Sequence, residues 1–253
     1  MKALVTGASS GIGRDMAIYL SKIGYEVILV ARDKIKLNQV LSKLSTKGEI
    51  LIADLKIKKD VDKVIKKSLD EKIDVLINNA GFGSYGSFYE SDLDREIEMI
   101  NVNVIAVHRL TKEVYKMMKD ANGGYILNVA SSAGLLPGGP LLDTYYATKS
   151  YVRSLTLGLY EENRRNSSNV HLSILCPGPI NTNFNEVAGT RFNLKSLSSD
   201  FVAEYAINKM FKNKLVIVPG FMVKCGLFFQ RCLNVKMLLR IIYNIQVKKG
   251  SKN

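Results

Sequence analysis

Short apolar runs that alternate with helical segments limit the possible folds of this chain. The runs are KALVT, EVILVA, EILIAD, DVLINNAG, GYILNVAS and VHLSILCPG, with a shorter run, KLVIVP, near residue 214. Helical patterns follow at residues 13–24, 33–45, 57–70, 90–119 and 144–165. The runs show no polar–apolar alternation, which is typical of strands buried on both faces. Repeated βαβ units of this kind predict an α/β fold with a doubly wound parallel sheet, the Rossmann fold.

The loop after the first strand has the sequence TGASSGIG, at residues 6–13. Its glycines, Gly7, Gly11 and Gly13, allow a sharp turn, a close approach of the backbone to a pyrophosphate, and tight packing of the next helix. The N-terminus of that helix would face the phosphate charge. A glycine-rich turn without a ligand is the alternative. The position between a first strand and a helix favours a dinucleotide site.

The formal charge of +13 lies almost entirely in the C-terminal tail. Ten basic residues and no acidic residue follow Glu204, so the first 208 residues have a net charge of +3 (13 − 10). A basic tail on a nearly balanced body does not predict a nucleic-acid-binding fold. The ten residues are Lys209, Lys212, Lys214, Lys224, Arg231, Lys236, Arg240, Lys248, Lys249 and Lys252.

Length and composition favour one domain in a reducing compartment. A chain of 253 residues with 47% hydrophobic and 23% charged residues is typical of a single globular α/β domain. Three cysteines without a CxxC pair predict neither a disulfide framework nor a zinc site, and His108 and His171 lie far apart, so no metal is expected. The N-terminus has no signal-peptide pattern. We therefore expect a cytoplasmic protein.

We assign residues 1–220 to a dinucleotide-binding and catalytic domain and residues 221–253 to a basic helical extension of the same domain. Charges interrupt the apolar runs of the extension, so no segment reaches the roughly 20 residues that span a bilayer. Three roles stay open for it: a lid over the active site, a contact in a homodimer or homotetramer, or a peripheral contact with an acidic membrane. Packing on its own domain or on a second copy is favoured. An apolar helical stripe supports this, formed by Val235, Leu238, Leu239, Ile242 and Ile245.

Six short motifs occur in a fixed order: TGASSGIG at 6–13, NNAG at 78–81, NVN at 101–103, SS at 131–132, YYATK at 145–149 and PGPINT at 177–182. Together they resemble the single-domain short-chain dehydrogenase/reductase family over residues 2–220. The resemblance implies an oxidoreductase that interconverts a carbonyl and an alcohol with a nicotinamide dinucleotide. It implies four catalytic residues: Asn103, Ser132, Tyr145 and Lys149.

The spacing alone does not decide which of the two adjacent tyrosines is catalytic, so the family pattern is needed. Lys149 is four residues from Tyr145 and three from Tyr146, and both separations bring side chains together on a helix. The family pattern of tyrosine, three residues and lysine points to Tyr145. The catalytic serine of the family lies thirteen residues earlier, which selects Ser132, whereas Ser131 is one residue off.

The predicted cofactor contacts come from six segments, of which all but Arg32 are implied by the resemblance. Asp54 resembles the aspartate that hydrogen-bonds the adenine amino group, and the PGPINT segment resembles the one that wraps the nicotinamide. Asn103 resembles the asparagine that holds a water in the proton relay. The cofactor set is Gly7, Ser9, Ser10, Gly11, Ile12, Gly13, Arg32, Asp54, Leu55, Asn79, Ala80, Gly81, Tyr145, Lys149, Pro177, Gly178, Ile180 and Thr182.

The chemistry of the four catalytic side chains agrees with this assignment. Hydride transfer to a ketone leaves an alkoxide that needs a proton, and a free tyrosine, with a pKa near 10, holds its proton too firmly. A nearby lysine ammonium is expected to lower the phenol pKa, and Ser132 to hold the substrate oxygen. We therefore predict an enzyme acting on a small or medium apolar carbonyl compound. A non-catalytic redox sensor or scaffold is the alternative, but it would need none of the four.

The end of the second strand, ILVARDK, bears on the choice of cofactor. Ala31 occupies the position where an acidic side chain would bind the ribose 2′-hydroxyl of NAD, and Arg32 suits a 2′-phosphate. Asp33 is expected to cap the next helix. The sequence therefore favours NADP(H) over NAD(H).

Overall fold

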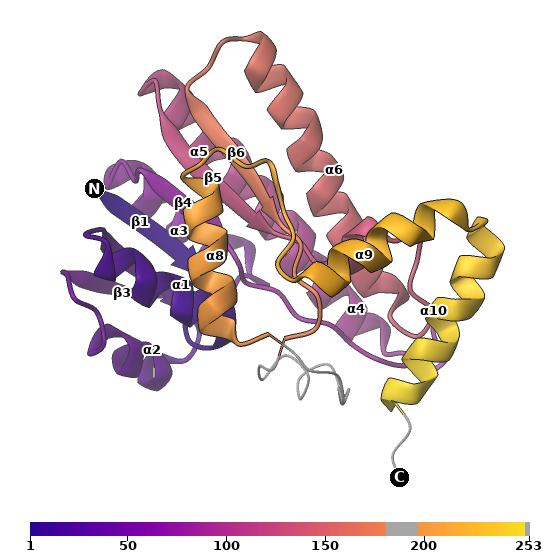
Figure 1. Cartoon of the computed structure of the whole chain (residues 1–253). Coiled ribbons are helices and arrows are strands. Elements are labelled where there is room, and N and C mark those ends of the chain that lie inside the picture. The colour runs from indigo at the N-terminus through magenta and orange to yellow at the C-terminus, as the bar shows by residue number, and fades with distance from the viewer. Residues whose placement is uncertain (181–196, 251–253) are drawn as a thin grey trace.

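The sheet contains seven parallel strands and confirms the predicted fold class (Figure 1). The structure is a computed structural model, which describes residues 1–180 and 197–250. The strand order is β3-β2-β1-β4-β5-β6-β7, so the chain reverses direction across the sheet between β1 and β4. The strands are β1 (Lys2–Thr6), β2 (Glu26–Ala31), β3 (Gly48–Ile52), β4 (Val75–Asn78), β5 (Gly124–Val129), β6 (Val170–Leu175) and β7 (Val216–Ile217).

Helices cover both faces of the sheet, because each strand has apolar side chains on both sides. Ala3 and Val5 of β1 belong to the core cluster that includes side chains of α1 (Gly11–Lys22), α2 (Lys34–Leu41) and α8 (Ser199–Met210). Leu4 lies between them in sequence and faces the opposite core, with α3 (Lys58–Asp70) and α5 (Val107–Asp120). This alternation buries a whole strand. In such a sheet the ligand site lies where the strand order reverses.

The segment predicted as one helix near residues 90–119 contains a break. It consists of α4 (Leu93–Ile100), the π-helical turn η1 (Asn101–Ala106) and α5. A π-helical turn shifts the side chains relative to a regular helix and often marks a functional site. Here it contains Asn103, which is fully buried. The long helix α6 (Asp143–Arg165) packs beside η1 and contains the two tyrosines and the lysine.

The C-terminal segment consists of α9 (Phe221–Phe229), η3 (Gln230–Cys232) and α10 (Val235–Gly250), and it projects at one side of the molecule beside α6 and α4 (Figure 1). Helix α10 buries Leu238, Ile242 and Gln246, at successive turns of one face. The predicted stripe is therefore wrong in part, because Val235 and Ile245 are 58% and 46% exposed. No helix in the described ranges is both long and apolar enough to span a membrane.

Candidate active site

The glycine loop after β1 is shaped by contacts that leave no room for side chains. Gly7 and Gly11 have φ angles of +66° and +53°, which side-chain-bearing residues rarely adopt. A Cβ atom on Gly7 would lie 2.8 Å from the amide nitrogen of Asn79, and one on Gly13 would clash with the Gly7 carbonyl oxygen. The Asn79 amide donates to the carbonyl oxygens of Thr6 (3.1 Å) and Gly7 (3.3 Å). The NNAG segment thereby fixes the loop.

The start of α1 is suited to a phosphate group. Its N-cap, Ser10, makes no side-chain capping hydrogen bond, so no side chain caps the amide groups of the first turn in this way. The helix dipole also favours negative charge at this end. The loop residues therefore fit the pyrophosphate of a dinucleotide, which Gly7, Gly11 and Ile12 would hold.

A cavity of about 510 Å³ extends from this loop along the carboxyl ends of the strands to α6. Seventeen of the predicted site residues line it: Gly7, Ser9, Ser10, Gly11, Ile12, Arg32, Asp54, Leu55, Asn79, Ala80, Gly81, Ser132, Tyr145, Lys149, Pro177, Gly178 and Ile180. Gly13 and Asn103 do not line the cavity. Gly13 packs against Asn79 and Gly7, and Asn103 hydrogen-bonds Phe82 in the cavity wall. Thr182 lies outside the described residues.

Tyr145 and Lys149 lie buried in α6, 9% and 4% exposed, and burial dominates their ionisation. Burial raises the pKa of Tyr145 to about 12 and lowers the pKa of Lys149 to about 8, because each charged form loses its hydration. The Lys149 ammonium donates to the Val129 carbonyl oxygen (3.0 Å) and lies 5.8 Å from the centre of the Tyr145 ring. Desolvation therefore dominates the pKa of the phenol, and the expected lowering by the lysine is not seen.

The serine that contacts the phenol is Ser131. A side-chain hydrogen bond between Ser131 and Tyr145 opposes the rise in the tyrosine pKa that burial causes. The Ser131 hydroxyl also accepts the backbone N–H of Ala133 (3.1 Å), which fixes it at the start of the short helix η2 (Ser132–Leu135). Ser132 lines the same cavity, and its backbone N–H donates to the Pro177 carbonyl oxygen (2.8 Å). The catalytic role that the thirteen-residue offset assigns to Ser132 stays a prediction.

Asn103 joins the NNAG segment to α6. Its side-chain oxygen accepts the N–H of Phe82 (3.1 Å), and its amide donates to the Phe82 carbonyl (2.9 Å) and to the Thr148 hydroxyl (3.1 Å). A Cβ atom on Gly81 would lie 2.9 Å from the Asn103 oxygen and 3.1 Å from the Lys149 ammonium. The hydrogen bonds of Asn103 join the chain after β4 to α6 at Thr148, the residue before Lys149. The water-holding role of Asn103 stays a prediction.

The C-terminal segment completes the site through Gln246 of α10. Its amide donates to the hydroxyl of Tyr146 (2.7 Å), its backbone carbonyl accepts the hydroxyl of Tyr85 (3.2 Å), and the residue lines the cavity. The Tyr146 hydroxyl thus points toward α10, whereas that of Tyr145 contacts Ser131. Gln246 was not predicted, because it is 100 residues from Tyr146 and no local sequence pattern links them.

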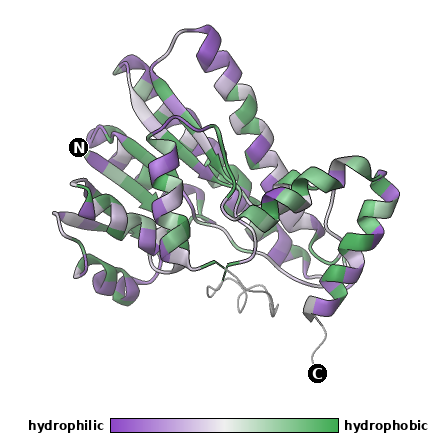
Figure 2. Ribbon diagram, viewed as in Figure 1, coloured by the Kyte–Doolittle hydropathy of each residue, from purple (hydrophilic) through white to green (hydrophobic). Residues whose placement is uncertain are grey.

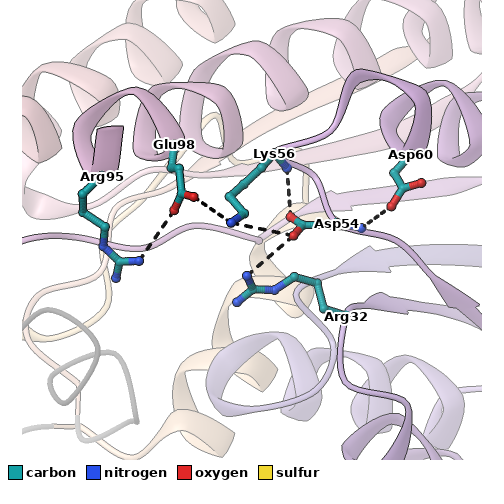
Figure 3. A network of polar contacts seen from close by, with 6 residues as sticks. All are labelled: Arg32, Asp54, Lys56, Asp60, Arg95 and Glu98. Atoms are coloured by element: carbon teal, nitrogen blue, oxygen red, sulfur yellow. Dashed lines mark hydrogen bonds and ion pairs between the residues drawn. The ribbon is translucent and has the colours of Figure 1, made fainter. Parts of the chain in front are cut away.

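The other end of the cavity contains a network of charged side chains (Figure 3). The Asp54 carboxylate lies between Arg32 (3.7 Å) and Lys56 (3.9 Å), and Lys56 also pairs with Glu98 (2.8 Å). Arg95 of α4 is 3.8 Å from Glu98, on the far side of the network from Arg32. Lys56, Glu98 and Arg95 were not predicted, because they come from separate loops and helices.

The expected cap at Asp33 is confirmed. Its carboxylate accepts the backbone N–H of Lys36 (3.0 Å) at the start of α2, and this hydrogen bond holds the Asp33 pKa below its usual range. The Lys36 ammonium is 3.7 Å from the same carboxylate. The Asp33 carboxylate therefore caps α2, and the Lys36 ammonium partly neutralises the negative charge that it places next to Arg32.

Comparison with known proteins agrees with this geometry. The family profile of short chain dehydrogenases matches residues 1–191. The very-long-chain 3-oxoacyl-CoA reductase of Anas platyrhynchos is 34% identical over 200 residues, which are 76% of this chain and 63% of that protein. The chain thus matches less than two thirds of the length of that relative.

Two solved structures have the same fold. A short-chain dehydrogenase from Sphingobium yanoikuyae in complex with NADPH superposes with a TM-score of 0.82 at 28% identity, covering 91% of this chain and 92% of that one. A short-chain dehydrogenase/reductase from Burkholderia phymatum in complex with NAD has a TM-score of 0.83 at 23% identity, covering 100% and 96%.

The glycine loop, the buried tyrosine–lysine pair and the profile match define a dinucleotide-binding oxidoreductase fold. The chain belongs to the short-chain dehydrogenase/reductase family.

Proposed function

We propose that this enzyme interconverts a carbonyl and an alcohol with NADP(H), and that Tyr145 exchanges the proton with the reacting oxygen. The observation that carries this proposal is the buried hydrogen bond between Tyr145 and Ser131 in the cavity that begins at the glycine loop. A bound nicotinamide would supply or accept the hydride. The residues of this chain orient the substrate oxygen, exclude water and deliver the proton.

In this proposal Ser131 takes the role that the sequence assigned to Ser132. Its hydroxyl can bind the Tyr145 phenol and the substrate oxygen together, which places the two reacting oxygens side by side. Lys149 binds the Val129 carbonyl at the cavity wall and would hold the nicotinamide ribose. Asn103 positions Lys149 through Gly81 and Thr148.

The preference for NADP(H) rests on Arg32. Its side chain is 68% exposed, and an exposed ion pair such as that with Asp54 contributes little, so the guanidinium can turn to a 2′-phosphate at small cost. Asp33 does not oppose this, because it caps α2 and pairs with Lys36. A charge-assisted hydrogen bond to the phosphate should favour NADPH over NADH about 10- to 100-fold.

Two measurements test the proposal. Purified protein should oxidise NADPH with members of a panel of aldehydes, ketones and 3-oxoacyl thioesters, and an inert panel would contradict the reaction class. Titration of reduced-nicotinamide fluorescence should show that Arg32→Ala removes most of the preference for NADPH. Arg95→Ala is the matched control, because it removes the same charge from the far side of the network. Equal affinities of the parent for both cofactors would refute the role of Arg32.

The substrate is expected to be apolar near its carbonyl group, since Phe82, Leu142 and Tyr146 line the cavity beside Tyr145. Assembly as a homodimer or homotetramer and a cytoplasmic location remain predictions from the sequence.

A further inference from the structure

Exposed apolar side chains concentrate on the C-terminal segment, away from the cavity. Ten large apolar residues between 221 and 247 are at least 40% exposed, and the other such residues are scattered over residues 1–201. Helix α9 has no buried residue, and both of its ends are aromatic. Figure 2 shows the hydrophobic colour over α9 and α10. The ten are Phe221, Met222, Phe228, Phe229, Val235, Met237, Ile241, Tyr243, Ile245 and Val247.

Helix α10 has two faces with different roles. Leu238, Ile242 and Gln246 face the protein body, and Gln246 reaches the substrate end of the cavity. At about 100° per residue, Met237, Arg240 and Val247 lie on the opposite side, and Ile241 lies at its edge. We call this side of α10, together with the exposed side chains of α9, the outer face. Packing against residues 1–180 and 197–250 does not explain its apolar content.

The outer face is also basic. Lys224, Lys236 and Arg240 are exposed, and none of them forms an ion pair with any residue in the described ranges. The chain contains no acidic residue after Glu204 to neutralise them. An apolar helix surface flanked by lysine and arginine is the pattern of helices that lie in the interface of anionic membranes.

Charge decides between a membrane and a second copy of the chain. In a two-fold dimer the same surface meets itself, so the basic side chains of both copies would be brought together without an acidic partner. Anionic headgroups instead complement this charge, while the phenylalanines enter the apolar layer. We propose that the outer face of α9 and α10 docks the protein on a membrane surface that contains anionic lipids. This docking does not depend on the proposed reaction.

Vesicle sedimentation with the full chain tests the electrostatic part. Binding should be strong to vesicles with about one third phosphatidylglycerol, weak to pure phosphatidylcholine, and reversed by raising the salt to about 0.5 M. At about fivefold per basic side chain, Lys236→Gln with Arg240→Gln should weaken binding about 25-fold. The control, Lys43→Gln with Lys59→Gln, removes the same charge near α2 and in α3, on the side of the molecule opposite α10, and should bind like the parent.

A second pair of variants tests the apolar part. Phe228→Ser with Phe229→Ser should weaken binding at least tenfold, whereas Phe88→Ser with Tyr89→Ser, an aromatic pair that is more exposed, should not. Equal sedimentation with neutral and anionic vesicles would overturn the proposal. So would a dimer in analytical ultracentrifugation that the Phe228 and Phe229 changes dissociate, because the outer face would then be a subunit contact.

Discussion

Replacing Ser131 by alanine should lower turnover about 100-fold, whereas the same change at Ser132 should cost less than about fivefold. The Ser131 hydroxyl is bound to a buried phenol, and it can donate to the charge that develops on the reacting oxygen. A hydrogen bond to a charged group contributes about 1.5–3 kcal/mol, equivalent to about 10- to 150-fold in rate. The Ser132 backbone contact with Pro177 survives in either variant.

The pH profile separates a direct role of Ser131 from a general loss of packing. The hydrogen bond from Ser131 opposes the burial that raises the Tyr145 pKa to about 12. Removing it should raise that pKa further, so the activity of alcohol oxidation, which needs the phenolate, should rise only at higher pH. Ser132→Ala should leave the profile unchanged. NADPH affinity, measured for both variants, should stay within about threefold of the parent.

The opposite result would refute this reasoning. If Ser132→Ala were inactive and Ser131→Ala retained full turnover with an unchanged profile, the thirteen-residue offset would identify the working serine. The contact between Ser131 and Tyr145 would then be only structural.

Four further outcomes are expected. Tyr145→Phe should lower turnover by about two to four orders of magnitude with little change in cofactor affinity. Tyr146→Phe should lower turnover by less than about tenfold, since the Tyr146 hydroxyl binds Gln246. Steady-state rates distinguish the two variants. Gln246→Leu should raise KM more than it lowers kcat, because it frees α10 from the site. Lys149→Met should abolish activity yet raise the unfolding free energy at pH 7 by about 1–3 kcal/mol. The reason is that burial lowers the lysine pKa from 10.5 to about 8, so the folded protein carries the charged lysine at a cost. Urea titrations should show this gain shrinking as the pH rises from 8 toward 10.5. Gly13→Ala should abolish NADPH binding in fluorescence titration, and wild-type affinity would contradict the crowded loop.

The parts of the site that depend on local sequence agree with the structure. The turn at Gly7 and Gly11, the cap at Asp33 and the spacing of Tyr145 and Lys149 each depend on a few consecutive residues. Buried strands separated by helices also restrict the topology strongly, because parallel crossovers are right-handed and lie on the faces of the sheet. The sequence by itself therefore determined the fold class and about half of the cavity lining.

The choice between adjacent side chains was decided only by tertiary structure. Whether Ser131 or Ser132 faces Tyr145 depends on the path of the chain between η2 and α6, and a single added residue there changes the answer. The burial that dominates the pKa values of Tyr145 and Lys149 comes from elements distant in sequence. Gln246 meets Tyr146 only because the tertiary fold brings α10 to the wall of the cavity, and no sequence period encodes a contact across 100 residues.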